Sequence, residues 1–303
     1  MTDLAVFLAK LVRAQLNKET VPPIPEGVKL TEIVDIAVDH KMVYFFLVPL
    51  LTADIDEPSQ KYLPAIKALI FKSMSKTLAQ ANELKKLIDI FEENEIINQP
   101  MKGAIMKFLY PSPEMREMGD VDILVREEDM ERAMSLLQEN GYIWNDDKKH
   151  DHHKVFTKAP HMYLEVHRAL YDKKVDATQY EYFKDISKRN LREGCKYTYD
   201  FSKEDFYVYM IAHMAKHFYI NGCGIRNLVD MHVYNQLYGA ELNRAYIDVE
   251  LEKCGIASFE KHISELTEIW LNGKESSPFY DNLFDYMLGS GFMERVRILH
   301  GEK

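Results

Sequence analysis

Apolar residues at helical spacing dominate the first third of the chain. They recur every three or four positions from residue 4 to 12, from 31 to 51 and from 63 to 91. This spacing places them on one face of a helix, so it predicts three amphipathic helices. Residues 21–25, with the sequence VPPIP, end the first helix as a stiff linker, and Pro49 stops or kinks the second.

The pattern changes in the middle third, where short apolar runs alternate with helical segments. It predicts strands over 96–101, 120–125, 153–158 and 163–169, with helices over 104–110 and 127–140. The last two strands form a hairpin across Ala159-Pro160. This order is typical of a small mixed sheet with helices on one side.

The helical period returns from Ser202, which stands three residues before Asp205 in the spacing of a capping box. Further helices are expected over 226–238, 243–254 and 259–271. We therefore predict an α+β fold in three parts. These are an N-terminal helical segment (1–94), an α/β domain (95–200) and a C-terminal helical domain (201–303).

Composition fits a folded protein. Of 303 residues, 47% are hydrophobic and 28% are charged, which does not indicate disorder. The longest apolar run, residues 42–51, is too short to span a bilayer, so we expect no membrane segment. The three cysteines lack C-x-x-C spacing and are expected to be reduced thiols in a cytoplasmic protein.

The net charge of −10 argues against long nucleic acid as a partner. Proteins that coat nucleic acid need clustered lysine and arginine for phosphate contacts. A small anionic ligand held by a local basic patch remains compatible with this balance.

Two aspartates carry the clearest chemistry. Asp120 and Asp122 stand two apart at the start of the apolar run 121–125, so both carboxylates leave the same face of the predicted strand. Close carboxylates on a buried strand require a cation or hydrogen-bond donors in compensation. A divalent metal would supply this, and Glu165, the carboxylate among apolar neighbours in a later strand, is the candidate third ligand.

These residues resemble the poorly characterised nucleotidyltransferases of the DNA polymerase β-type superfamily. The resemblance rests on Lys102-Gly103, Arg116, Asp120 to Val125, Asn140-Gly141-Tyr142 and Leu164 to His167. It implies transfer of a nucleoside monophosphate from an NTP to an acceptor hydroxyl, with release of pyrophosphate. It also implies two Mg²⁺ ions, replaceable by Mn²⁺, bound by the catalytic residues Asp120, Asp122 and Glu165.

The same resemblance implies a phosphate cradle after the first strand. Its residues here are Lys102, Gly103, Ala104 and Arg116, with His167 as a further substrate contact. In the superfamily the glycine is followed by Gly or Ser, whereas Ala104 stands here, and the gap to the first aspartate is long. Lys102 and Arg116 would compensate with positive charge.

Other interpretations stay open. Asp120 and Asp122 could begin a strand in solvent, and Gly103 could be an ordinary turn. His213 and His217 share a helical face and could bind a metal with Asp230, although a role in acceptor binding is favoured. The main functional alternative is a catalytically inactive nucleotide-binding or protein-interaction module, such as half of a toxin–antitoxin pair. The choice of NTP, the acceptor and the oligomeric state are not readable.

Overall fold

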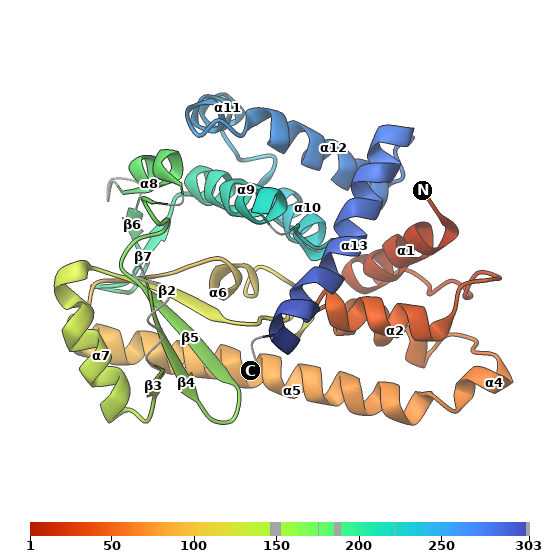
Figure 1. Cartoon of the computed structure of the whole chain (residues 1–303), viewed down its shortest axis with the longest axis horizontal. Helices are drawn as coiled ribbons and strands as arrows, with labels where there is room; N and C mark the ends of the chain where they lie inside the picture. Colours follow the sequence, from red (N-terminus) through yellow and green to blue (C-terminus); the bar gives the residue numbers. More distant parts are fainter. Residues whose placement is uncertain (146–152, 175, 185–188, 221, 301–303) are drawn as a thin grey trace.

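The computed structural model describes residues 1–145, 153–174, 176–184, 189–220 and 222–300. It is an α+β fold in which helices surround a small five-stranded sheet (Figure 1). The N-terminal helices are α1 (Asp3–Asn17), α2 (Leu30–Asp39), α3 (Val43–Leu47), the 3₁₀ turn η1 (Pro49–Leu51), α4 (Glu57–Gln60) and α5 (Leu63–Glu93). The sheet region contains α6 (Gly103–Met106), η2 (Pro113–Met115), η3 (Glu127–Asp129) and α7 (Met130–Glu139).

The remaining helices follow the sheet. They are α8 (Ala177–Phe183), α9 (Lys203–Ile220), α10 (Arg226–Tyr238), α11 (Arg244–Lys253), α12 (Ala257–Asn272) and α13 (Pro278–His300). None of the helices in the described ranges is both long and apolar enough to cross a membrane. The capping box at the start of α9 is present, because the Ser202 hydroxyl accepts a hydrogen bond from the Asp205 backbone N–H at 3.0 Å.

The sheet is mixed and has the strand order β1-β2-β5-β4-β3. Its strands are β1 (Asn98–Pro100), β2 (Val121–Val125), β3 (Ile143–Asn145), β4 (His153–Lys158) and β5 (Met162–His167). β2 and β5 are parallel, and the other neighbouring pairs are antiparallel. A separate hairpin joins β6 (Arg189–Leu191) to β7 (Tyr199–Phe201).

Side chains alternate along β2, so the two faces of the sheet carry different residues. Val121, Ile123 and Val125 enter an apolar core with α5 and α7. Asp122 and Leu124 point to the other face, where Leu124 joins the core built by the N- and C-terminal helices. Helices therefore cover both faces, not one as the α/β segment alone predicted, because helices from outside that segment pack on the second face.

The N-terminal and C-terminal helices share one hydrophobic core. Phe7 and Leu8 of α1 belong to the same cluster as Trp270 of α12, whose indole N–H donates to the Ala5 carbonyl at 2.9 Å. Figure 1 shows α1 and α2 beside α12 and α13, at opposite ends of the colour scale. The division of the chain at residues 94 and 200 stays a prediction, but the two helical parts pack on each other.

Helix ends differ from the periodicity where local geometry intervenes. The helix predicted over 31–51 is interrupted between α2 and α3, where Lys41 has a φ of 54° that a helix cannot contain. The helix predicted over 104–110 is shorter, as α6 ends at Met106. β3 and the β6–β7 hairpin were not predicted, because strands of three residues show too little alternation to be recognised. Helix α13 was not predicted either.

Lys107, immediately after α6, is fully buried. Its ammonium donates to the Thr77 carbonyl of α5 at 2.7 Å. Burial, together with the neighbouring positive charge of Arg116, lowers the pKa of Lys107 to about 7. In the unfolded chain this lysine has the ordinary pKa of about 10.4. Between pH 7 and pH 10 the unfolded chain therefore binds more protons than the folded chain does. The lysine therefore contributes a free energy of unfolding that rises with pH between 7 and 10.

We predict that Lys107→Met removes this dependence. The difference in unfolding free energy between variant and wild type should change by up to about 4 kcal/mol between pH 7 and pH 10, in favour of the wild type at high pH. Urea denaturation at four pH values measures it, with Lys86→Met, an exposed lysine of α5, as the control. If the free energies of unfolding of the wild type and of Lys107→Met change with pH in parallel, the prediction is contradicted.

Candidate active site

The strand register brings together two of the three predicted catalytic carboxylates. Asp122 on β2 and Glu165 on β5 are direct partners in the parallel pair, so both leave the same face of the sheet. Asp120 lies just before β2 and two residues from Asp122. Asp122 is buried, with 2% of its surface exposed, whereas Glu165 is half-buried and Asp120 is exposed. The trio thus runs from the surface into the sheet.

Two basic side chains of the chain itself contact Asp122. The Lys102 ammonium lies 2.7 Å from Asp122 Oδ1, and His167 Nε2 lies 2.8 Å from the same oxygen. His167 Nε2 also lies 3.3 Å from Glu165 Oε2. The buried carboxylate is therefore paired, as burial of a charge requires.

These contacts set the direction of each pKa. Burial alone would raise the pKa of Asp122, but Lys102 and His167 outweigh it and hold that pKa well below its usual range. Burial would likewise raise the pKa of Glu165, yet its hydrogen bond with His167 lowers it. The pKa of His167 is raised, because its hydrogen bonds to both carboxylates outweigh the opposing effect of burial.

Asp120 behaves differently. Its side chain is open to solvent on one side, yet loss of hydration among the surrounding protein atoms and the charge of Asp122 raise its pKa. Lys41, at the break between α2 and α3, opposes this shift. The end of the Lys41 side chain lies close to Gly119, where a β-carbon would stand 2.7 Å from its ammonium nitrogen. No sequence pattern pointed to Lys41, which comes from the N-terminal helical segment.

The donor set fits divalent metal ions. Asp122 and Glu165 offer carboxylate oxygens from one face, and Asp120, just before β2, interacts electrostatically with both. Carboxylate oxygens are the ligands that Mg²⁺ prefers. Lys102 and His167 lie where positive charge compensates these oxygens. A metal ion at Asp122 Oδ1 would therefore compensate the carboxylate charge in place of Lys102 and His167.

The predicted phosphate turn adopts an unexpected conformation. Lys102, not Gly103, has a positive φ of 48°. Gly103 packs closely instead, since a β-carbon there would stand 3.1 Å from Met118 Sδ and the methionine side chain would have to shift slightly. The Ala104 N–H donates to the Met101 carbonyl at 2.9 Å and the Ile105 N–H to the Lys102 carbonyl at 3.1 Å. Those two amides are thus engaged within the turn. The amides of Lys102 and Gly103 show no backbone hydrogen bond to the part of the chain that the structure describes, so an anion could accept from them.

Arg116 is placed behind the turn. Its guanidinium forms a buried two-pronged ion pair with Asp230 of α10, at 2.7 and 2.8 Å, and Tyr110 donates to the same carboxylate at 2.7 Å. A Gly103 β-carbon would lie 3.6 Å from Arg116 Nη1, so the arginine packs against the turn. With its donors engaged, Arg116 is suited to holding the turn in place, and Asp230 is engaged away from His213 and His217.

Helix α9 faces the carboxylates. The Tyr209 hydroxyl contacts Met101 Sδ at 3.7 Å, next to the turn. Burial lowers the pKa of His213 well below its usual range, and the positive charge of Lys102 adds to this effect. The pKa of Lys216 is lowered by burial and by Lys102, while Asp122 opposes the shift. His213 Nε2 and His217 Nε2 lie 3.0 Å apart.

One further residue of the site was missed by sequence reasoning. His153 on β4 is the register partner of His167, and its Nε2 lies 3.9 Å from Glu165 Oε2. The signal was available only in part. His153 begins a predicted hairpin strand, but its pairing with His167 depends on the length of the turn.

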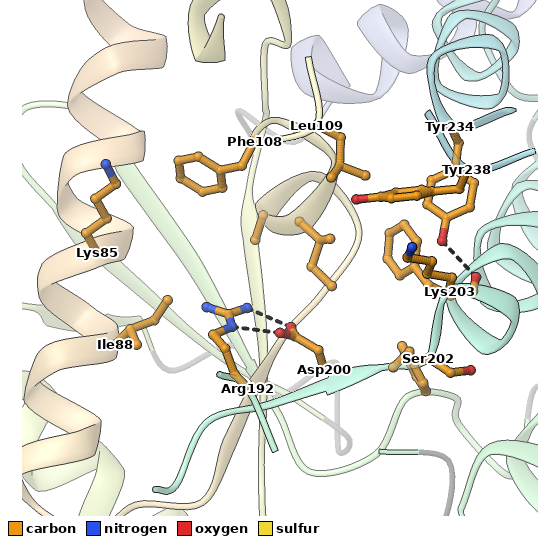
Figure 2. A pocket seen from close by; sticks show the side chains of 14 residues that line it. Lys85, Ile88, Phe108, Leu109, Arg192, Asp200, Ser202, Lys203, Tyr234 and Tyr238 are labelled. Carbon is orange, nitrogen blue, oxygen red and sulfur yellow. Dashed lines mark hydrogen bonds and ion pairs between the residues drawn. The ribbon is translucent and has the colours of Figure 1, made fainter. Parts of the chain in front are cut away.

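A cavity of about 450 Å³ lies behind the turn. Figure 2 shows Lys85 and Ile88 of α5, the Arg192–Asp200 ion pair of the β6–β7 hairpin, and Tyr234 and Tyr238 of α10 around it. Ala104 also lines the cavity, but Asp120, Asp122 and Glu165 do not. The cavity is therefore separate from the carboxylate site.

Three kinds of known proteins were compared with the chain: curated proteins, solved structures and protein families. No curated protein matches the chain. Among solved structures, an antigenic nucleotidyltransferase-like protein from Paracoccidioides brasiliensis is similar, with 15% identity and a TM-score of 0.38, over 67% of this chain and 94% of that chain. A family model described as an uncharacterised nucleotidyltransferase matches residues 26–272. Because that match extends over well more than half of the sequence, the protein belongs to this family of uncharacterised nucleotidyltransferases.

Proposed function

We propose that the protein is a Mg²⁺-dependent nucleotidyltransferase that moves a nucleoside monophosphate from an NTP to an acceptor hydroxyl and releases pyrophosphate. The observation that carries the proposal is the pairing of Asp122 with Glu165 across β2 and β5, with Asp120 on the same face. Mn²⁺ is expected to substitute for Mg²⁺. Bound ions would neutralise phosphate charge and activate the attacking hydroxyl.

Each carboxylate has a separate task in this proposal. Asp120 and Asp122 would hold two ions, and Glu165 would hold one of them. Glu165 is also the candidate acceptor of the hydroxyl proton, since its lowered pKa keeps it ionised at neutral pH. His167, which contacts both Asp122 and Glu165, would orient them.

The triphosphate would be held by positive charge and by the turn. Lys102 is bound to Asp122 here, and an ion at Asp122 would release its ammonium towards the phosphates. The amides of Lys102 and Gly103 would add hydrogen bonds. Ala104 and Arg116 would support the turn from behind, in place of the direct contacts predicted for them.

Calorimetric titration tests the proposal directly. Non-hydrolysable analogues of ATP, GTP, CTP and UTP are titrated with Mg²⁺ and with EDTA, into wild type and into Asp120→Ala/Asp122→Ala. Mg²⁺-dependent binding that the double variant loses would support the site and justify an acceptor screen. A folded wild type that binds no nucleotide with any metal would contradict it.

A nucleotide-binding or protein-interaction module without catalysis is the second candidate. The contacts of Lys102 and His167 with Asp122 favour it, because they compensate the buried carboxylate without a metal. Metal-dependent release of pyrophosphate from an NTP separates the two candidates. A stoichiometric protein that co-purifies and blocks nucleotide binding would favour the second.

Lys216 provides a further prediction. Its ammonium lies over the Tyr171 ring at 5.6 Å and is electrostatically coupled to Lys102 and Asp122. If it contacts the triphosphate, Lys216→Ala should weaken Mg²⁺–NTP binding about tenfold or more, the worth of one charge-assisted hydrogen bond. Lys203→Ala, on the same helix but paired with Glu241, is the control. Equal affinities in the two variants would remove Lys216 from the site.

A further inference from the structure

Two imidazoles and a carboxylate meet at the β4–β5 hairpin. His153 and His167 are direct register partners, and Glu165 lies two residues before His167, so all three side chains leave the same face. Both histidines are buried, and their ring centroids lie 5.0 Å apart. The sheet thus fixes this cluster by backbone pairing, without help from a flexible loop.

The distances suit a metal ion. One ligand atom from each of the three residues lies within 4.8 Å of the others. His167 Nε2 is 3.3 Å and His153 Nε2 is 3.9 Å from the same oxygen, Glu165 Oε2. Ligand atoms about 2.1 Å from a tetrahedral metal stand roughly 3.4 Å from one another. A small rotation of His153 would therefore complete three corners of such a site.

The donor types decide which metal would bind. Mg²⁺ prefers an all-oxygen set with octahedral geometry, whereas imidazole nitrogens suit Zn²⁺, Co²⁺ and their neighbours. Two histidines with one carboxylate leave a fourth position for water or substrate. Glu165 is the most exposed of the three side chains, at 19%, so that position would open towards solvent.

We propose that His153, Glu165 and His167 form a binding site for a divalent transition metal of the Zn²⁺ or Co²⁺ type, next to the Asp120–Asp122 carboxylates. Glu165 is shared with the proposed Mg²⁺ site and links the two. On binding, His167 exchanges its contacts with Asp122 and Glu165 for a bond to the metal. The proposal rests on the geometry of the hairpin and does not require nucleotidyl transfer.

Co²⁺ is the probe, because it gives visible absorption bands that report its coordination. The full chain, without an affinity tag and after chelator treatment, is titrated with Co²⁺ alone. We expect one tight equivalent with a visible band. His153→Gln should weaken Co²⁺ binding at least about tenfold, the loss found when even an outer partner of a metal ligand is removed.

Three controls make the test specific. His213→Gln/His217→Gln removes the other imidazole pair and should leave Co²⁺ binding unchanged. Asp120→Asn should lose Mg²⁺–NTP binding and keep Co²⁺ binding, so the two proposals can fail separately. Glu165→Gln should also lose Co²⁺ binding. It serves as the test variant if His153→Gln does not fold.

The outcomes that overturn the proposal are clear. The first is that the wild type binds no Co²⁺. The second is that His153→Gln and Glu165→Gln both bind Co²⁺ as the wild type does. The third is that only the His213→Gln/His217→Gln variant loses Co²⁺ binding. Loss in His153→Gln and Glu165→Gln, with thermal unfolding that shows folded proteins, supports it.

Discussion

Asp122→Asn is expected to abolish Mg²⁺-dependent nucleotide turnover, with a loss of about a thousandfold or more. The physical reason is the position of Asp122, which is buried, paired with Glu165 across the strands and adjacent to Asp120. A carboxylate that places a metal against phosphate oxygens is worth several kcal/mol, and each 1.36 kcal/mol is a factor of ten in rate. Pyrophosphate release and calorimetric Mg²⁺–NTP binding measure the loss.

The matched control for Asp122→Asn is Asp54→Asn/Asp56→Asn. These aspartates have the same two-residue spacing, but they are exposed and lie before α4, outside the sheet. The Asp54→Asn/Asp56→Asn protein should bind and turn over nucleotide as the wild type does. Thermal unfolding must accompany the measurement, because Asp122→Asn leaves Lys102 and His167 without their anionic partner. Full turnover in a folded Asp122→Asn protein would refute the assignment of the site.

The second large effect is expected at the Arg116–Asp230 ion pair. Asp230→Asn should lower the free energy of unfolding by about 3–5 kcal/mol, because it leaves the arginine charge buried without its counter-ion. Tyr110 would also lose the charge of its acceptor. The pair joins the turn region to α10, so Mg²⁺–NTP affinity should fall with stability.

Urea denaturation measures this effect, and a second variant separates charge from packing. Arg116→Met/Asp230→Leu replaces both charges with apolar groups and should recover much of the lost stability. Glu19→Gln, which breaks an exposed ion pair with Arg13, should cost less than about 1 kcal/mol. An Asp230→Asn protein as stable as the Glu19→Gln control would show that the pair does not hold the turn in place.

Local patterns predicted much of the fold. The long helix α5, the positions of strands β1, β2, β4 and β5 along the chain and the start of α9 all follow from spacing within a few residues. The spacing of Asp120 and Asp122 also predicted that they share a face, because side chains of a strand alternate. Asp120 lies just before β2, so this stays a prediction. The α+β class followed from the same patterns, and the nucleotidyltransferase family was predicted from a resemblance of the motif residues; both are confirmed.

Partners distant in the sequence were set only by tertiary structure. The register of β2 with β5 places Asp122 opposite Glu165, and a shift by one residue would turn Glu165 to the apolar face. The ion pair of Arg116 with Asp230 joins residues 114 positions apart. The pair suits Arg116 to supporting the turn, and the phosphate contact expected of Arg116 stays a prediction.

The pairing of His153 with His167 depends on the length of the hairpin turn, which the residue pattern alone does not specify. The positive φ at Lys102 was likewise not predicted from the sequence. Periodicity records which face of an element is apolar, since burial acts on each residue separately. It does not record which elements meet, because that choice depends on how the whole set of apolar faces can be buried together. The sequence therefore determined the elements and the chemistry they carry, whereas the tertiary structure decided which side chains share a site.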